Sequence, residues 1–159
     1  MGSADIPFFR RLLASDAAWG PLVLRVPIGV IFLAHGAQKL FGAFGGYGLE
    51  GTGKFMASLG LNPGYLMALL AGSAEFFRGL ALVVGLLLRP AAALLVVTMF
   101  AAIGTVHLHK GFFMTANGYE FALALLAAAA SLMVSGAGRL SVDGKLAPGV
   151  QEARPFVAG

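Results

Sequence analysis

The chain has 159 residues, of which 58% are hydrophobic and only 11% are charged, with a formal net charge of +4 and no cysteine. A soluble domain carries about 25% charged residues, so this composition excludes a mostly water-facing surface and indicates a membrane protein. Without cysteine, the chain has no disulfide, thiolate metal site or dithiol redox chemistry of its own.

Four apolar runs predict membrane-spanning helices, at residues 21–41, 65–88, 90–107 and 118–135. Each approaches the ~20 residues that cross about 30 Å of hydrocarbon, although the third and fourth are short. The runs are rich in Ala and Leu and lack period-two alternation, which favours helix over strand. The sequence therefore predicts an all-α, integral-membrane four-helix bundle at residues 21–135, between an N-terminal segment (1–20) and a tail (136–159).

The connection between the first two runs, residues 42–64, contains eight glycines. Within it, residues 51–60 predict a short amphipathic helix at the membrane surface. Its expected lipid-facing side chains are Phe55, Met56 and Leu59.

Two local features predict how the helices pack. Pro90 directly follows Arg89, and proline favours a helix start, so the second and third runs are expected to form a tight antiparallel hairpin. Small residues at 127–131 form a smooth face for close helix approach, and Gly29 and Gly36 are its expected counterpart.

Lysine and arginine counts predict the orientation. Six lie at the termini or beside the hairpin turn: Arg10, Arg11, Arg89, Arg139, Lys145 and Arg154. Three lie on the opposite side: Lys39, Lys54 and Lys110. Because cytoplasmic loops carry the excess of these residues, both termini are expected in the cytoplasm, with the glycine-rich loop facing the periplasm. The basic residues form no run, which favours this topological role over nucleic-acid binding.

Several polar side chains lie within or at the ends of the apolar runs, where charge insertion costs roughly 2.5–3.5 kcal/mol per residue. Those expected to meet in the outer half of the bundle are His35, Lys39, Glu75, Arg78, His107, Tyr119 and Glu120. The expected ion pairs are Glu75 with Arg78 or Lys39, and Glu120 with His107, His109 or Lys39. A purely structural pair between helices remains an alternative. Arg25, near the inner end, is expected to extend to the headgroups.

A metal ion, haem and a quinone are the candidate ligands of this cluster. His35, His107 and His109 are candidate metal ligands, but their spacing is not diagnostic and the chain lacks the Glu-x-x-His pairs of di-iron bundles. The prediction is therefore no metal site, and haem has no better support. Quinone binding needs an apolar slot with a few hydrogen-bonding groups. The aromatic side chains expected to form it, unless they face lipid, are Phe76, Phe77, Phe112 and Phe113.

The segments LRVPIGVIFLAHGAQKLFG, AEFFRGLALVVGLLLRPAA, GYEFALALLAAAA and GAGRLSVDG together resemble the DoxX family of small bacterial membrane proteins. The resemblance covers about residues 24–145. It implies a four-helix inner-membrane protein, and the seven residues of the polar cluster match recurrent motifs. Family members are named for a thiosulfate–quinone oxidoreductase subunit or are linked to membrane oxidoreductases that handle oxidative or thiol stress.

The resulting functional hypothesis is an accessory or quinone-interacting subunit of a membrane oxidoreductase system. One alternative is a small transporter that uses the Glu75–Arg78 pair, and another is an assembly subunit without a ligand. The expected partners are the lipid bilayer, a membrane or periplasmic oxidoreductase, and further copies of the chain. Whether the chain catalyses a reaction stays open.

Overall fold

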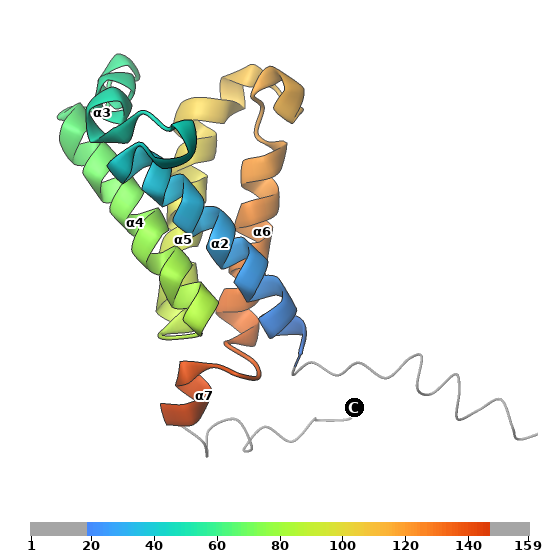
Figure 1. Cartoon of the computed structure of the whole chain (residues 1–159). Coiled ribbons are helices and arrows are strands. Elements are labelled where there is room, and N and C mark those ends of the chain that lie inside the picture. The colour runs from blue at the N-terminus through green and yellow to red at the C-terminus, as the bar shows by residue number, and fades with distance from the viewer. Residues whose placement is uncertain (1–18, 147–159) are drawn as a thin grey trace, which may run out of the picture.

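The structure of the chain is a computed structural model that describes residues 19–146, and this part is helical without any strand. Its four longer helices are α2 (Gly20–Phe41), α4 (Gly64–Val84), α5 (Leu88–Ala102) and α6 (Glu120–Ser135) (Figure 1). Two shorter helices are α3 (Gly48–Ser58) and α7 (Val142–Leu146). The predicted N-terminal segment up to residue 18 and the tail beyond residue 146 lie outside the described residues.

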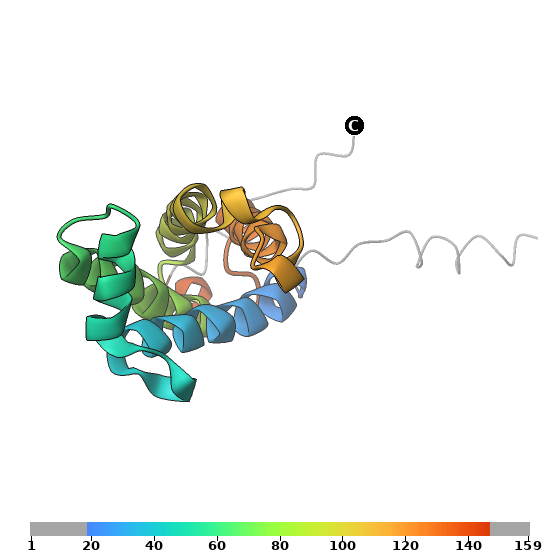
Figure 2. The ribbon, with the colours of Figure 1, turned by 90° about the horizontal axis from the view of Figure 1, so that it is seen from above.

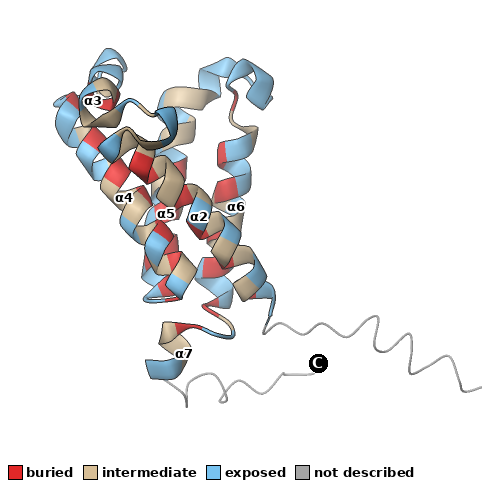
Figure 3. Ribbon diagram, viewed as in Figure 1, coloured by how far each residue is buried: buried red, intermediate tan, exposed pale blue. Residues whose placement is uncertain are grey.

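Three helical segments are long and apolar enough to cross a membrane: α2, α4 and the segment Leu88–Lys110 that α5 begins. α6 is also apolar but has 16 residues, so it is shorter than these three. Much of the outer surface of the helices is exposed (Figure 3). Large apolar side chains such as Val23, Val97 and Val134 are mostly exposed, as lipid-facing residues are. The all-helical membrane fold is therefore confirmed, whereas a fourth span and the orientation of the termini stay predictions.

The predicted second span, 65–88, runs four residues past the end of α4. Gly85 ends the helix with a positive φ of 71°, and its N–H donates to the carbonyls of Ala81 and Leu82. A side chain at this position would also collide with Arg25 and Ser141. Apolar residues continue through Leu88, so hydropathy alone does not reveal the turn. The expected tight hairpin is present, with α5 beginning at Leu88.

α2 and α4 cross closely as an antiparallel pair. Gly29 lies against Gly79, and Gly36 lies against the backbone of Phe76, where an added methyl group would overlap neighbouring atoms. Such glycines let helix backbones approach in a membrane. The expected pairing of Gly29 and Gly36 with the small residues of the last helix is therefore wrong, because both glycines face α4.

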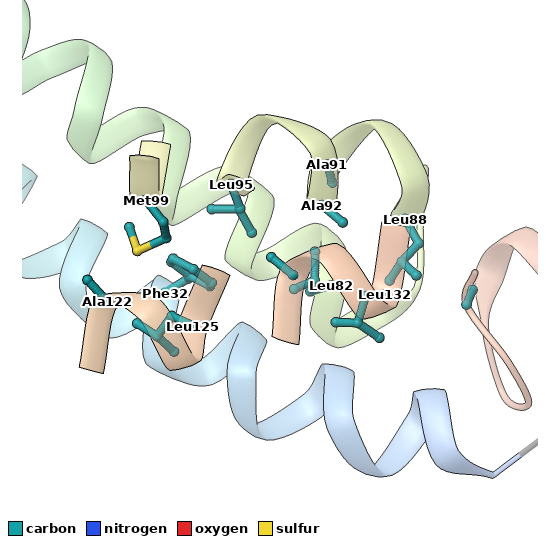
Figure 4. Close-up of a cluster of buried hydrophobic side chains, with 12 residues drawn as sticks. Phe32, Leu82, Leu88, Ala91, Ala92, Leu95, Met99, Ala122, Leu125 and Leu132 are labelled. Carbon is teal, nitrogen blue, oxygen red and sulfur yellow. The ribbon is translucent and has the colours of Figure 1, made fainter. Parts of the chain in front are cut away.

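The apolar core occupies the half of the molecule nearer the α4–α5 turn. It consists mainly of side chains from α5 and α6, joined by Phe32 of α2 and Leu82 of α4 (Figure 4). Leu88, Leu95 and Leu132 are fully buried within it. This core joins the α2–α4 pair to the α5–α6 pair at one end, which we call the turn end.

Arg25 closes the turn end. Its side chain is 1% exposed, and its guanidinium donates to the carbonyls of Leu82, Val83 and Leu140 at 2.8, 2.6 and 2.8 Å. The last carbonyls of a helix are not fully used by the helix itself, so those of Leu82 and Val83 can accept from a buried cation, although Leu82 also accepts from the N–H of Gly85. The expectation that Arg25 extends to the headgroups is therefore wrong.

The segment after α6 folds back onto the same turn. The carboxylate of Asp143 accepts hydrogen bonds from the backbone N–H groups of Leu87 and Leu88 at 2.7 and 2.9 Å. These groups lie at the start of α5, which has no cap from its own neighbouring residues. Asp143 thus caps a helix from 55 residues away, and the chain after α6 seals the turn end.

Candidate functional site

A partly open cavity of about 920 Å³ occupies the other half of the molecule, which we call the α3 end. Seen from above, the α2–α4 pair with α3 lies on one side and the α5–α6 pair on the other (Figure 2). Residues from all five of these helices line the cavity. Phe32, Met99 and Leu125 belong to both its wall and the core, so the cavity begins where the core ends.

Five of the seven predicted cluster residues line this cavity: His35, Lys39, Glu75, Arg78 and His107. They come from three segments of the fold. His35 and Lys39 are four residues apart on α2, and Glu75 and Arg78 are three apart on α4, so each pair shares a helix face. His107 reaches the cavity from the segment that continues α5.

One ion pair joins the facing helices inside the cavity. Lys39 Nζ lies 2.5 Å from a carboxylate oxygen of Glu75, and the two side chains are 25% and 6% exposed. Glu75 was expected to pair with Arg78 or Lys39, and in the structure it pairs with Lys39. Arg78 lies on the same helix as Glu75 but forms no ion pair with it. A carboxylate this deep in an apolar bundle needs a partner or a proton, and Lys39 supplies the positive charge.

Tyr119 and Glu120 do not line the cavity. A carboxylate oxygen of Glu120 accepts a hydrogen bond from the N–H of Met114 at 2.6 Å. The Tyr119 ring packs edge-on against Phe112, with centroids 5.4 Å apart. Both residues thus shape the connection between η3 (Leu108–Lys110) and α6.

The expected ion pair of Glu120 with a histidine or Lys39 is wrong. The only ion pairs within residues 19–146 are Lys39–Glu75 and Lys54–Glu50. His107 instead has its Nδ1 2.9 Å from the carbonyl oxygen of Asn117. A carboxylate beside unpaired backbone N–H groups bonds to them as readily as to a cation, and sequence spacing does not distinguish the two.

The helix that supplies His107 changes its winding before it reaches the cavity rim. Residues Ile103–His107, labelled η2, form a π-helix after α5. Thr105, Val106 and His107 of this turn all line the cavity. π-Turns inside helices occur frequently at functional sites. The sequence reasoning missed this feature, because a π-turn has no residue pattern that distinguishes it from an ordinary helix.

The expected aromatic slot is wrong. None of Phe76, Phe77, Phe112 and Phe113 lines the cavity. Phe77 is 57% exposed, and Phe76 packs edge-on between Phe77 and Phe41. Phe76 and Phe77 are adjacent on α4 and point in different directions, so this pair cannot place both rings in one site.

The aromatic residues of the cavity are Phe32, Phe55 and Phe121. The His35 ring lies 6.2 Å from that of Phe121, between centroids. Phe55 belongs to α3, which confirms the predicted short helix. Together with Met56 it faces the cavity, which corrects the expected lipid-facing side. The sequence pattern of α3 predicts that the helix has an apolar face, but it does not indicate whether this face contacts lipid or lines a cavity.

The three histidines do not assemble into a ligand set. His35 and His107 line the cavity, whereas His109 is exposed in η3. Within the described residues, no three side chains of His, Asp or Glu gather as they would around a metal ion.

The fold and the site together define a small helical membrane protein with a ligand-sized cavity that contains an ion pair. The DoxX family model matches residues 20–108, and the chain belongs to the DoxX family. The matched region includes the five predicted cluster residues that line the cavity and ends before Tyr119 and Glu120.

Two relatives were found among curated proteins. The chain is 36% identical over 124 residues to "Putative oxidoreductase CatD" of Bacillus subtilis (strain 168), which covers 78% of this chain and 84% of that protein. It is 31% identical over 156 residues to "Uncharacterized membrane protein Rv3486" of Mycobacterium tuberculosis, with 91% of each chain covered. No solved structure matches the chain significantly.

Proposed function

We propose that the chain is an accessory, quinone-interacting subunit of an oxidoreductase system in the bacterial inner membrane, and that the cavity at the α3 end binds the quinone. The cavity itself carries this proposal. Its volume of about 920 Å³ lies in the range of small-molecule sites, and its wall is mostly apolar with a few polar groups. These are the requirements of a neutral ring with two carbonyl oxygens and an apolar tail.

Three further observations support the proposal. Lys39, Arg78, His35 and His107 supply hydrogen-bond donors at the cavity wall for quinone oxygens. The chain has no cysteine, so electron chemistry needs a bound ligand or a partner. The name of the Bacillus subtilis relative contains the word oxidoreductase. The partner we propose is a membrane or periplasmic oxidoreductase. A homo-oligomer of the chain is a second proposed assembly.

The direct test is a titration of purified protein in lipid nanodiscs with ubiquinone and menaquinone analogues, followed by thermal unfolding. We expect a saturable increase in Tm, because a ligand that binds only the folded state stabilises it. Ala74→Trp should abolish the increase by filling the cavity. Leu80→Trp is the matched control, because Leu80 lies on the same helix but is exposed and outside the cavity. An unchanged Tm with every quinone would refute the proposal.

We propose that both termini lie in the cytoplasm and that α6 is a fourth span, which places the cavity toward the periplasm. Trp19 and Arg139 support a membrane interface at the turn end, because the guanidinium carbon lies 5.2 Å from the Trp19 ring centroid. The chain offers a clean test because it has no cysteine. Ser58→Cys should react with an impermeant thiol reagent added outside cells, whereas Lys145→Cys should not. The opposite result would show that the termini lie outside the cytoplasm. Labelling of both cysteines would place Ser58 and Lys145 on the same side, so that only two of the three helices between them cross the membrane and the number of spans is odd.

A second function, a small transporter, has one observation in its favour. The Lys39–Glu75 pair faces a cavity within the apolar bundle, and ionisable groups in that position often form proton or ion paths. The structure replaces the expected Glu75–Arg78 pair with this one. Substrate-dependent flux in proteoliposomes, abolished by Glu75→Gln, would favour transport over quinone binding. If neither flux nor quinone binding is observed, the remaining hypothesis is an assembly subunit without a ligand.

A further inference from the structure

The charges that line the cavity do not balance. Lys39, Glu75 and Arg78 are the side chains with permanent charge in its wall. Lys39 and Glu75 neutralise each other at 2.5 Å. Arg78 is therefore left as a positive charge in a mostly apolar cavity.

The other carboxylates of the described chain are engaged elsewhere. Glu50 pairs with Lys54 at 2.8 Å on the surface of α3, and Glu120 accepts from the N–H of Met114. Asp143 caps α5 at the turn end. Within residues 19–146 no carboxylate lies within ion-pair distance of Arg78.

Arg25 shows what a buried arginine needs in this fold. Its guanidinium is held by four main-chain carbonyls at the end of α4 and after α6. Arg78 lies in the middle of α4, where the carbonyls are used by the helix itself, and its side chain makes no hydrogen bond to any described residue. A half-buried guanidinium without an acceptor is costly, so an external anion would stabilise it.

We propose that Arg78 is the receptor for the anionic group of an amphiphilic ligand, namely a carboxylate or phosphate on an apolar body. The inference goes beyond the proposed function, because it rests only on the cavity being a ligand site and not on that ligand being a quinone. The planar guanidinium fits carboxylate and phosphate with two parallel hydrogen bonds. Such a ligand reaches the site as a free fatty acid or as an anionic phospholipid.

The cavity wall suits an apolar body of variable shape. Four of the six methionines of the chain line it: Met56, Met67, Met99 and Met114. Methionine is flexible and polarisable, and it lines surfaces that accept different apolar partners. The ligand's charge is thus recognised at one position, and its chain is held by adaptable contacts.

The test compares oleate with methyl oleate, which differ only in the charged group. Binding to the full chain is measured by competition with a fluorescent fatty acid in phosphatidylcholine nanodiscs. We expect the wild type to bind oleate about tenfold more tightly, as one charge-assisted hydrogen-bonded contact allows. Arg78→Gln should make the two affinities equal. Arg89→Gln, which removes an exposed arginine at the turn end, should retain the tenfold preference.

A second variant covers the case in which Arg78→Gln does not fold. Arg78→Lys keeps the charge but loses the two-pronged contact, so the preference for oleate should fall several-fold without disappearing. Native mass spectrometry with phosphatidic acid against phosphatidylcholine forms the phospholipid arm. Phosphatidic acid retained by the wild type but not by Arg78→Gln would assign the anion to a phospholipid.

The outcomes separate this inference from the proposed function. Equal wild-type affinities for oleate and its ester, with no retention of phosphatidic acid, would overturn the role of Arg78 even if quinones raise Tm. An Arg78-dependent preference for anions without any effect of quinones would support Arg78 and refute the quinone proposal. A preference for oleate that survives in Arg78→Gln would also overturn the inference.

Discussion

The two ends of this molecule treat buried charge in different ways. At the turn end, Arg25 is fully buried and its guanidinium is bound to carbonyl groups from two segments of the chain. At the α3 end, Lys39 and Glu75 neutralise each other beside an open cavity, and Arg78 has no partner among the described residues. The first arrangement holds helices together, whereas the second leaves capacity for a ligand. Whether a polar residue in a membrane bundle has a structural role or is available to a ligand therefore depends on which groups already pair with it.

The largest effect should come from Arg25→Met, which removes the donor from four carbonyl groups at the turn end. We expect a loss of about 3 kcal/mol in unfolding free energy, because buried acceptors lose their partner. Unfolding in mixed micelles measures it. Arg89→Met is the control at the same end, because Arg89 is exposed and has one hydrogen bond of 3.4 Å. Equal effects of the two variants would show that the hydrogen bonds of Arg25 do not hold the turn end together.

Gly79→Ala should cost about 2 kcal/mol, because the added methyl group overlaps the backbone of α2 at Gly29 and Leu33. Gly104→Ala is the matched control, since a methyl group there meets nothing within 4 Å. Thermal unfolding of both variants gives the comparison. A stable Gly79→Ala variant would contradict the close α2–α4 crossing on which the cavity wall depends.

The Lys39–Glu75 pair should contribute a coupling energy of about 1.5 kcal/mol in a double-mutant cycle of Lys39→Met and Glu75→Gln. This is smaller than the effect at Arg25, because the pair borders a cavity and Lys39 is 25% exposed. The double variant should be more stable than the sum of the single losses predicts. A coupling near zero would indicate that the pair does not form in the bilayer.

Asp143→Ala should have the smallest effect, about 1 kcal/mol, the usual cost of losing a helix N-cap. Hydrogen exchange at Leu87 and Leu88 should accelerate more than elsewhere in α5. Asp143→Asn should retain only part of the stability, because its single amide oxygen replaces one of the two carboxylate oxygens that accept these bonds. Uniform protection along α5 in Asp143→Ala would contradict capping from the folded-back segment.

Much of the helical architecture was predictable from the sequence. Long runs of Ala and Leu predicted α2, α4 and α5, and Pro90 indicated the hairpin turn. Side chains that share a helix face, such as His35 with Lys39 and Glu75 with Arg78, were predictable from their spacing. The short helix in the glycine-rich loop was predictable from its amphipathic pattern, although its cavity-facing side was not.

Other features depended on which segments meet in space. Arg25 was interpreted as an interfacial residue, because its acceptors lie 57 residues or more away in the chain. Glu120 was assigned to the cluster from its place at a span end, yet its carboxylate accepts a hydrogen bond from the backbone N–H of Met114. The phenylalanine pairs were expected to line a slot, but Phe76 and Phe77 point away from the cavity on α4, and Phe112 and Phe113 lie in the connection between η3 and α6.

The sequence by itself determined that this protein is a helical membrane protein, because hydropathy and charge act on each segment independently of its neighbours. It also determined which polar side chains share a face of one helix. Only the tertiary structure decided which charges are neutralised, by whom, and where the cavity lies. The physical reason is that ion pairs, caps and cavities depend on distances between segments remote in the chain, and those distances follow from packing such as the glycine contact of α2 with α4.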